Sequence, residues 1–248
     1  MPQAFHDSNG SFPHGSRAAR TSPALERFTE RLIAGDRVGC RDALREYIAD
    51  GHDSLDAMRE LAWPACHAID LLGRRDQIAA VHEHGALVLL AQLVQRLECG
   101  LAKHPARCRH VVVASGRSQS EELAGEIFAG IAEADGFDVL FLGGGVESDD
   151  LYAELGRRRP EFLVSFSASG ADAPRLRRVI DAVRRQNPVP GLQIGVGGGV
   201  FERVPGLADE IGADFAADSP FEMLDALRAA SARGRQQAPG GIRRSRAA

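Results

Sequence analysis

Serine and glycine residues cluster next to several apolar runs of this sequence. Two short glycine runs, Gly143–Gly145 and Gly197–Gly199, each follow such a run. Glycine lets a backbone adopt a positive φ angle or approach a ligand closely. The nearby serines, whose hydroxyl groups can donate hydrogen bonds, are Ser115, Ser118, Ser120, Ser165, Ser167 and Ser169. Together these residues predict a binding site for a large ligand, although either glycine run alone is equally consistent with a tight turn.

The common catalytic and nucleotide-binding motifs are not found around these residues. None of the serines lies in a G-x-S-x-G sequence, so a hydrolase triad is not favoured. Neither glycine run has the G-x-G-x-x-G pattern, and the segment 114–119 is not a phosphate-binding P-loop. Classical sites for dinucleotides and nucleoside triphosphates are therefore disfavoured.

The sequence His82-Glu83-His84 is the other candidate for metal chemistry. Positions 82 and 84 lie about 200° apart on a helix, so these two imidazoles cannot hold one metal from the same face. The H-E-x-x-H spacing of zinc proteases is missing. His104 and His110 have no partners at metal-ligand spacing. A single helical histidine is more commonly a packed or surface residue than a ligand.

Composition limits the classes of partner. The 248 residues carry a net charge of −4 and only 6% aromatic residues, so neither a basic field nor base stacking favours nucleic acid. No apolar run approaches the roughly 20 residues of a membrane span, and no signal peptide is recognisable. We expect a cytoplasmic protein. Its four cysteines form no C-x-x-C pair and are expected to be free thiols, mostly buried.

The residues that could do chemistry must be positioned by two different halves of the chain. Residues 25–102 have apolar residues at helical spacing and predict a small four-helix bundle, with a kink or break at Pro64. Residues 108–231 alternate apolar strands with helices. Polar tails, predicted to be disordered, flank both parts at residues 1–24 and at the arginine-rich residues 232–248.

The second half predicts an α/β fold of a defined kind. Five short apolar strands alternating with helices within about 120 residues indicate a flavodoxin-like, or Rossmann-like, parallel sheet. Such sheets bind ligands at the carboxyl ends of their strands. The loops 115–121, 143–148, 167–172 and 197–200 are therefore expected to form the site, beneath the helical bundle as a cap.

This arrangement resembles the cobalamin-binding modules of methionine synthase, of corrinoid proteins of methyltransferases and of cobalamin-dependent photoreceptor and antirepressor regulators. The resemblance covers about residues 24–230. The stretches that carry it, each weak alone but in the family's order, are residues 32–36, 60–69, 78–84, 135–143, 196–199 and 211–214.

Three positions depart from the family pattern. The family's first loop reads D-x-H-x-x-G, and its histidine is the lower cobalt ligand. In this chain Glu121 stands at the histidine position and Ala124 at the glycine position. The tryptophan of the cap falls on Gly73, whereas Glu83 and His84 are retained. A carboxylate is a poor substitute for imidazole as an axial ligand of cobalt.

The resemblance implies a protein that binds cobalamin, or haem as an alternative, between the cap and the sheet edge. It implies a metal ligand at His84 and cofactor contacts at Ser118, Gln119, Glu121, Ser167, Ser169, Gly197, Gly198, Gly199 and Glu83. The expected function is that of a non-enzymatic sensor without its own DNA-binding domain, which signals to a protein partner such as a transcription regulator. A methyl-carrying corrinoid protein and a degenerate module that acts only through protein partners are the alternatives.

Overall fold

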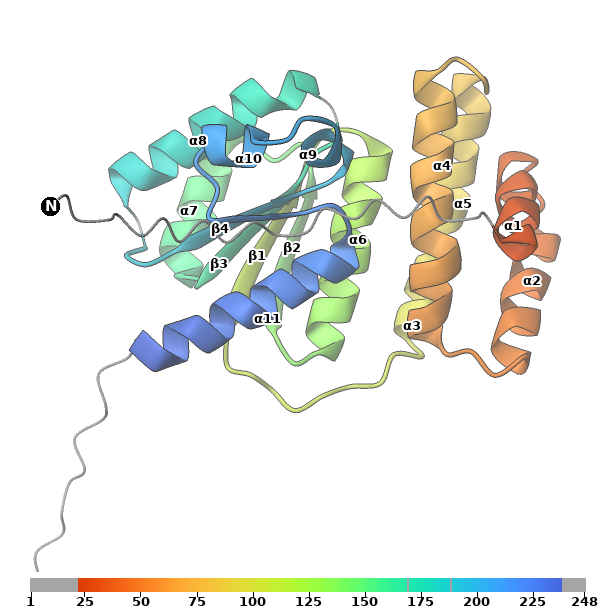
Figure 1. Ribbon diagram of the computed structural model, residues 1–248, viewed down its shortest axis with the longest axis horizontal. Coiled ribbons are helices and arrows are strands. Elements are labelled where there is room, and N and C mark those ends of the chain that lie inside the picture. Colours follow the sequence, from red (N-terminus) through yellow and green to blue (C-terminus); the bar gives the residue numbers. More distant parts are fainter. Residues whose placement is uncertain (1–21, 169, 188, 238–248) are drawn as a thin grey trace, which may run out of the picture.

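The computed structural model describes residues 22–168, 170–187 and 189–237. The predicted tails lie mostly outside these ranges, as does Ser169. The described chain forms a helical cap, residues 23–98, beside an α/β domain, residues 110–237 (Figure 1). No helix in the described ranges is both long and apolar enough to cross a bilayer.

The cap has the predicted four-helix architecture, with one of its helices divided into three segments. The elements are α1 (Pro23–Ile33), α2 (Arg37–Ala49), α3 (Ser54–Ala57), the π-helical η1 (Met58–Ala62), α4 (Trp63–Arg74) and α5 (Ala80–Glu98). Ser22 caps α1 by accepting a hydrogen bond from the Leu25 amide at 3.2 Å. Asp53 and Asp56 form a capping box at α3, where the sequence restarts after Gly51.

The break predicted at Pro64 takes the form of a change in helix type. Proline has no amide hydrogen to donate to the preceding turn. The π-helical segment η1 ends directly before α4, and the Trp63 amide donates to the Met58 carbonyl five residues back. One extra residue is thus accommodated in a helical run that continues from Ser54 to Arg74.

The α/β domain is built on one parallel sheet with the order β2-β1-β3-β4-β5. This is the predicted flavodoxin-like order. The strands are β1 (His110–Ser115), β2 (Asp138–Gly144), β3 (Phe162–Phe166), β4 (Gln193–Gly197) and β5 (Phe215–Ala217). The helices are α6 (Gln119–Ala134), α7 (Ser148–Arg158), η2 (Gly170–Asp172), α8 (Ala173–Gln186), α9 (Gly199–Arg203), α10 (Leu207–Glu210) and α11 (Pro220–Gln237). Helix α11 thus continues past residue 231, the expected end of the domain.

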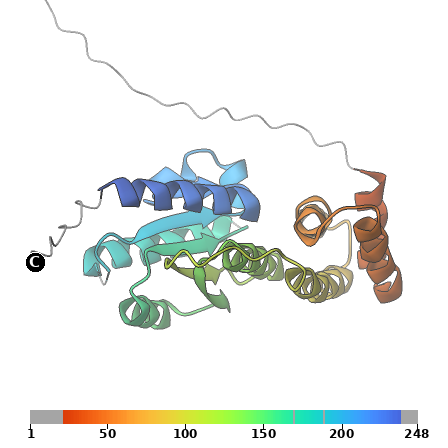
Figure 2. The ribbon, with the colours of Figure 1, turned by 90° about the horizontal axis from the view of Figure 1, so that it is seen from below.

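Both faces of the sheet are buried, as expected for parallel strands. Alternate residues of β1 point to opposite faces: Val111 and Val113 pack with α6, α11 and the cap, whereas Val112 packs with α7 and α8. The cap shares its hydrophobic cluster with α6, and Figure 2 shows it beside the α/β domain on that side. Helices α4 and α5 are therefore held against α6 rather than tethered loosely.

A buried ion-pair cluster joins the end of α6 to α11 and to the segment between α5 and β1. Asp135, at the end of α6, is 3% exposed and binds Arg107 of the connecting segment and Arg228 of α11, both at 2.8 Å. Burial alone would raise the pKa of Asp135, but the two guanidinium groups outweigh it and lower the pKa. The carboxylate therefore joins three segments that are distant in sequence.

Candidate functional site

The carboxyl edge of the sheet meets helix α4 of the cap at a cavity with an empty volume of about 330 Å³, partly open to solvent. We call it the edge cavity. Its lining comes from the cap and from three loops at the strand ends, as expected from the fold. The lining residues are Trp63, Cys66, His67, Asp70, Ser120, Glu121, Ala124, Phe166, Ser167, Ala168, Gly198 and Gly199.

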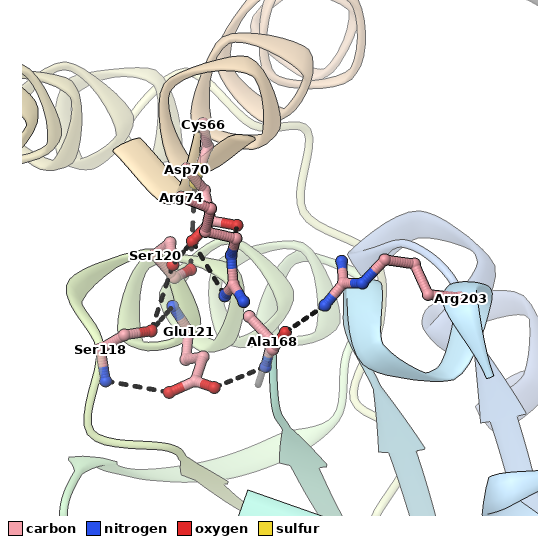
Figure 3. Close-up of polar contacts among 8 residues, drawn as sticks. All are labelled: Cys66, Asp70, Arg74, Ser118, Ser120, Glu121, Ala168 and Arg203. Carbon is pink, nitrogen blue, oxygen red and sulfur yellow. Dashed lines mark hydrogen bonds and ion pairs between the residues drawn. The ribbon is translucent and has the colours of Figure 1, made fainter. Parts of the chain in front are cut away.

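Hydrogen bonds close one side of the edge cavity between the cap and α6 (Figure 3). Ser120 Oγ donates to Asp70 Oδ1 at 2.7 Å, and Arg74 donates to both oxygens of Asp70 at 2.6 and 3.2 Å. The Cys66 thiol lies 3.9 Å from the Ser120 carbonyl oxygen, to which it donates. Burial, followed by the charge of Asp70, raises the pKa of Cys66, so this sulfur stays protonated.

Glu121 has a structural position rather than one that faces the cavity with a free carboxylate. Its side chain accepts hydrogen bonds from the backbone amides of Ser118, at 2.9 Å, and Ala168 (Figure 3). It completes a capping box with Ser118 at the start of α6. The residue is only 2% exposed. Glu121 therefore joins the start of α6 to the loop after β3.

A second carboxyl group faces Glu121 from the start of α8. Burial raises the pKa of Asp172, and the charge of Glu121 and a hydrogen bond between the two carboxyl groups raise it further. Arg175 and Arg117 act in the opposite direction but do not reverse the shift. Two negative charges in contact repel each other, so the contact favours the protonated form of Asp172 relative to an isolated aspartate.

The glycines after β4 have different roles. Gly198 has a φ angle of +107°, and a Cβ built on it would lie 2.2 Å from the Ser167 carbonyl oxygen, so only glycine fits. A Cβ on Gly197 would press on the rings and methyl groups of the core, which makes Gly197 a packing residue. Gly199 lines the edge cavity next to Arg203, which donates to the Ala168 carbonyl (Figure 3).

A second cavity, of about 580 Å³, lies between the sheet and helices α7 and α8. We call it the strand cavity. Ser115, Ser165, Ser167, Asp172 and Arg175 are its polar lining residues, and the remainder of the lining is mostly apolar. It touches the edge cavity at Phe166 and Ser167, which line both.

Three buried polar atoms near these cavities have no hydrogen-bond partner in the described ranges. They are Ser115 Oγ, Ser167 Oγ and Gln119 Oε1. Buried polar groups are normally hydrogen-bonded, and leaving one unpaired costs about 1–3 kcal/mol. Their concentration at the carboxyl edge of the sheet is what a site for a polar-rimmed ligand requires.

The structure brings together some of the predicted site residues and leaves others apart. Gln119, Glu121, Ser167 and the glycines after β4 gather at the sheet edge, with Ser118 capping α6 beside them. Ser169 lies outside the described residues. Glu83 and His84 line neither cavity.

Glu83 and His84 are positioned by the cap instead. The Glu83 carboxylate fills the space beside Gly73, where a built Cβ would lie 2.2 Å from Glu83 Oε2. A tryptophan at that position would collide with this side chain in the conformation described. His84 is exposed on α5. Its role as a metal ligand stays a prediction.

The sequence analysis did not identify the cap residues that reach the edge cavity. Trp63, His67 and Asp70 lie on the face of α4 that points to the sheet edge, and the rings of Trp63 and His67 are 6.4 Å apart. Their helical spacing in the sequence places these residues on one face of a helix, and this pattern could have identified them. The tryptophan of this chain, Trp63, lines the edge cavity from a position ten residues before Gly73, where the resembled family has its tryptophan. No group of three His, Cys, Asp or Glu side chains in the described residues is arranged to hold a metal ion.

Comparison with known proteins agrees with this geometry. Residues 109–225, which make up most of the α/β part of this chain, match the family described as the B12 binding domain. The monomethylamine corrinoid protein of Methanosarcina barkeri has the same fold, with a TM-score of 0.73 at 14% identity. That alignment covers 84% of this chain, cap included, and 98% of the other.

Two further solved structures align over a similar span. A cobalamin-binding protein of Desulfitobacterium hafniense DCB-2 gives a TM-score of 0.44 at 18% identity, covering 83% of this chain and 97% of the other. The methanol:cobalamin methyltransferase complex of Methanosarcina barkeri gives 0.46 at 14% identity, covering 84% and 80%. No protein with a curated functional description matches this chain.

Proposed function

We propose that this protein binds cobalamin at the carboxyl edge of its sheet and acts as a cytoplasmic sensor that signals to a protein partner, such as a transcription regulator, rather than as an enzyme. The observation that carries the proposal is the group of unpaired buried atoms, Ser115 Oγ, Ser167 Oγ and Gln119 Oε1, at the ligand-binding edge of a B12-binding domain. A bound polar ligand would supply their missing partners.

The residues present fit a corrinoid in most respects. The strand cavity combines apolar walls with serine hydroxyls, which suits the nucleotide end of the ligand. Gly198 and Gly199 allow close approach of a macrocycle from the sheet side, while Trp63 and His67 approach from the cap. The edge cavity is smaller than cobalamin requires, so binding needs the cap and the sheet edge to separate.

The position of Glu121 supports a sensor over a methyl carrier. Its carboxylate already accepts two backbone hydrogen bonds and lies against the Asp172 carboxyl group. It is therefore not available as a strong lower ligand that would tune cobalt during methyl transfer. Cobalt, when bound, supplies an exchangeable coordination position that can respond to light, redox state or ligand, which is the chemistry a sensor needs.

Titration of the purified protein with hydroxocobalamin, adenosylcobalamin and haem, under aerobic and anaerobic conditions, tests the proposal. We expect saturable absorbance changes with a cobalamin at near one equivalent. Ser115→Val and Ser167→Val should weaken binding, whereas Ser22→Val, at the exposed start of α1 and in the lining of neither cavity, should not. A response to haem alone would redirect the assignment to a haem sensor. No response to any of the three would favour a module that acts only through protein contacts.

A further inference from the structure

We propose that His67, on helix α4 of the cap, supplies a nitrogen ligand to the cobalt of the bound corrinoid. The inference rests on the proposed function and names the protein atom that would contact the metal. It follows from the hydrogen bonds and the burial of the side chains that line the edge cavity.

The edge cavity has four side chains in its lining that could donate to a metal: Cys66, His67, Asp70 and Glu121. Cys66 is a buried thiol whose raised pKa keeps it protonated, and a thiol must lose its proton to ligate. Asp70 is bound to Arg74 and Ser120. Glu121 is bound to two backbone amides. Three of the four donors are therefore already engaged.

Of these four side chains, His67 remains as a possible metal ligand. Its ring nitrogens make no hydrogen bond to any residue in the described ranges, and its side chain is half-buried. The Trp63 indole lies beside it, with ring centroids 6.4 Å apart at 46°. A neutral imidazole is a good ligand for transition metals of this kind.

His67 also lies next to the glycine backbone that follows β4. A Cβ built on Gly199 would lie 3.8 Å from His67 Cε1 and 2.8 Å from a guanidinium nitrogen of Arg203, whose side chain donates to the Ala168 carbonyl. The imidazole therefore reaches the backbone at the sheet edge, beside Arg203. Separation of the cap from the sheet edge would leave this imidazole and Trp63 on the cap side of the opened space.

The other histidines do not share this position. In the described part of the chain they are His52, His82, His84, His104 and His110, and none lines the edge cavity. His52 stacks on Tyr47 at 4.1 Å, and His110 contacts Asp138 at 2.7 Å. His84 is exposed on the neighbouring helix α5. It therefore provides a matched control.

The experiment uses cobinamide, a corrinoid that lacks the nucleotide base and so cannot provide its own nitrogen ligand. The full chain is loaded with cobinamide, reduced to Co(II), and examined by electron paramagnetic resonance. We expect splitting from one nitrogen in the wild type, and a changed splitting when histidine is labelled with ¹⁵N. His67→Ala and the closer match His67→Gln should lose the splitting, whereas His84→Ala should keep it.

Rescue and binding measurements make each outcome decisive. Added imidazole should restore the splitting in His67→Ala if the side chain acted as a ligand. The proposal is overturned if His67→Gln keeps the nitrogen splitting, if His84→Ala loses it, or if the cobinamide-loaded wild type has none. Failure of the wild type to bind cobinamide and cobalamin at all would instead remove the proposed function, and this inference with it.

Discussion

At the scale of single residues, the role of Glu121 in the structure differs from the role that its position in the sequence implies. The family resemblance assigns Glu121 to cofactor binding because it stands at the position of the lower cobalt ligand. The structure shows a carboxylate that caps α6 and holds the loop after β3. A carboxylate accepts hydrogen bonds from backbone amides, which a neutral imidazole nitrogen does for one amide at most.

Glu121→Gln should destabilise the protein. The substitution replaces one accepting oxygen by an amide nitrogen that faces a backbone N–H, which leaves a buried donor unpaired. We expect a loss of about 1–3 kcal/mol in the free energy of unfolding, measured by urea denaturation. Glu122→Gln, at the adjacent exposed position, should change it by less than about 0.5 kcal/mol. Equal effects of the two substitutions would contradict the role of Glu121 in joining the start of α6 to the loop after β3.

Gly198→Ala tests the turn after β4. Alanine at a φ angle of +107° is strained, and its Cβ would also collide with the Ser167 carbonyl. Gly206→Ala is the control, because Gly206 has a φ angle of +86° but open space around it. Gly206→Ala should cost about 1 kcal/mol and Gly198→Ala clearly more, by thermal or urea unfolding. A cost at Gly198 no larger than at Gly206 would disprove the collision.

At the scale of elements, most of the fold could be predicted from sequence. Five apolar runs alternating with helices predicted a flavodoxin-like parallel sheet, and the structure has five parallel strands in the order β2-β1-β3-β4-β5. The cap face that reaches the site could not be predicted in the same way. The apolar stripe of α4 includes Ala65 and Ile69, which pack into the core, and the segment η1 shifts the phase that an ideal helix would have.

The contact between α5 and α6 should make stability depend on pH. Burial, followed by the charges of Glu126 and Glu133, raises the pKa of Glu98 from 4.5 to about 7. The folded protein therefore retains a proton that the unfolded chain releases, so the free energy of unfolding should fall as pH rises from about 4.5 to 7.

Glu98→Gln isolates this contribution. Glutamine is neutral at every pH, so the variant should be more stable than the wild type at pH 8 and close to it at pH 5. Urea denaturation at the two pH values measures the difference. Glu46→Gln, on α2 and away from this contact, should show no such dependence on pH. A difference between Glu98→Gln and the wild type that is the same at both pH values would refute a raised pKa.

At the scale of the whole molecule, the cap and the α/β domain pack together, with a small, partly open site between them. A shared hydrophobic cluster joins α5 to α6, and the Asp70–Ser120 hydrogen bond joins α4 to the start of α6. The bond lies at the sheet edge, where a large ligand must enter. Opening at this end does not require the cluster between α5 and α6 to separate.

Asp70→Ala should loosen the cap without unfolding it. The substitution removes the acceptor for Ser120 and the partner of Arg74. We expect faster hydrogen exchange in α4 and in the first turn of α6, and faster association of cobalamin. Asp42→Ala removes an exposed carboxylate of the cap that pairs with Arg45 and should leave both rates unchanged. If hydrogen exchange is unchanged in Asp70→Ala, the hydrogen bond between Asp70 and Ser120 does not hold the cap to the sheet edge.

The π-helical segment Met58–Ala62 has a consequence for how this site can vary between related chains. Each residue of an α-helix turns the chain by about 100°. Deletion of one residue from this segment would restore regular helix and rotate α4 by about that angle relative to α3. Trp63 and His67 would then turn away from the sheet edge, although neither had been altered. The insertion or deletion of one codon in this segment would thus change which side chains of α4 face the sheet edge. No substitution within α4 would have the same effect.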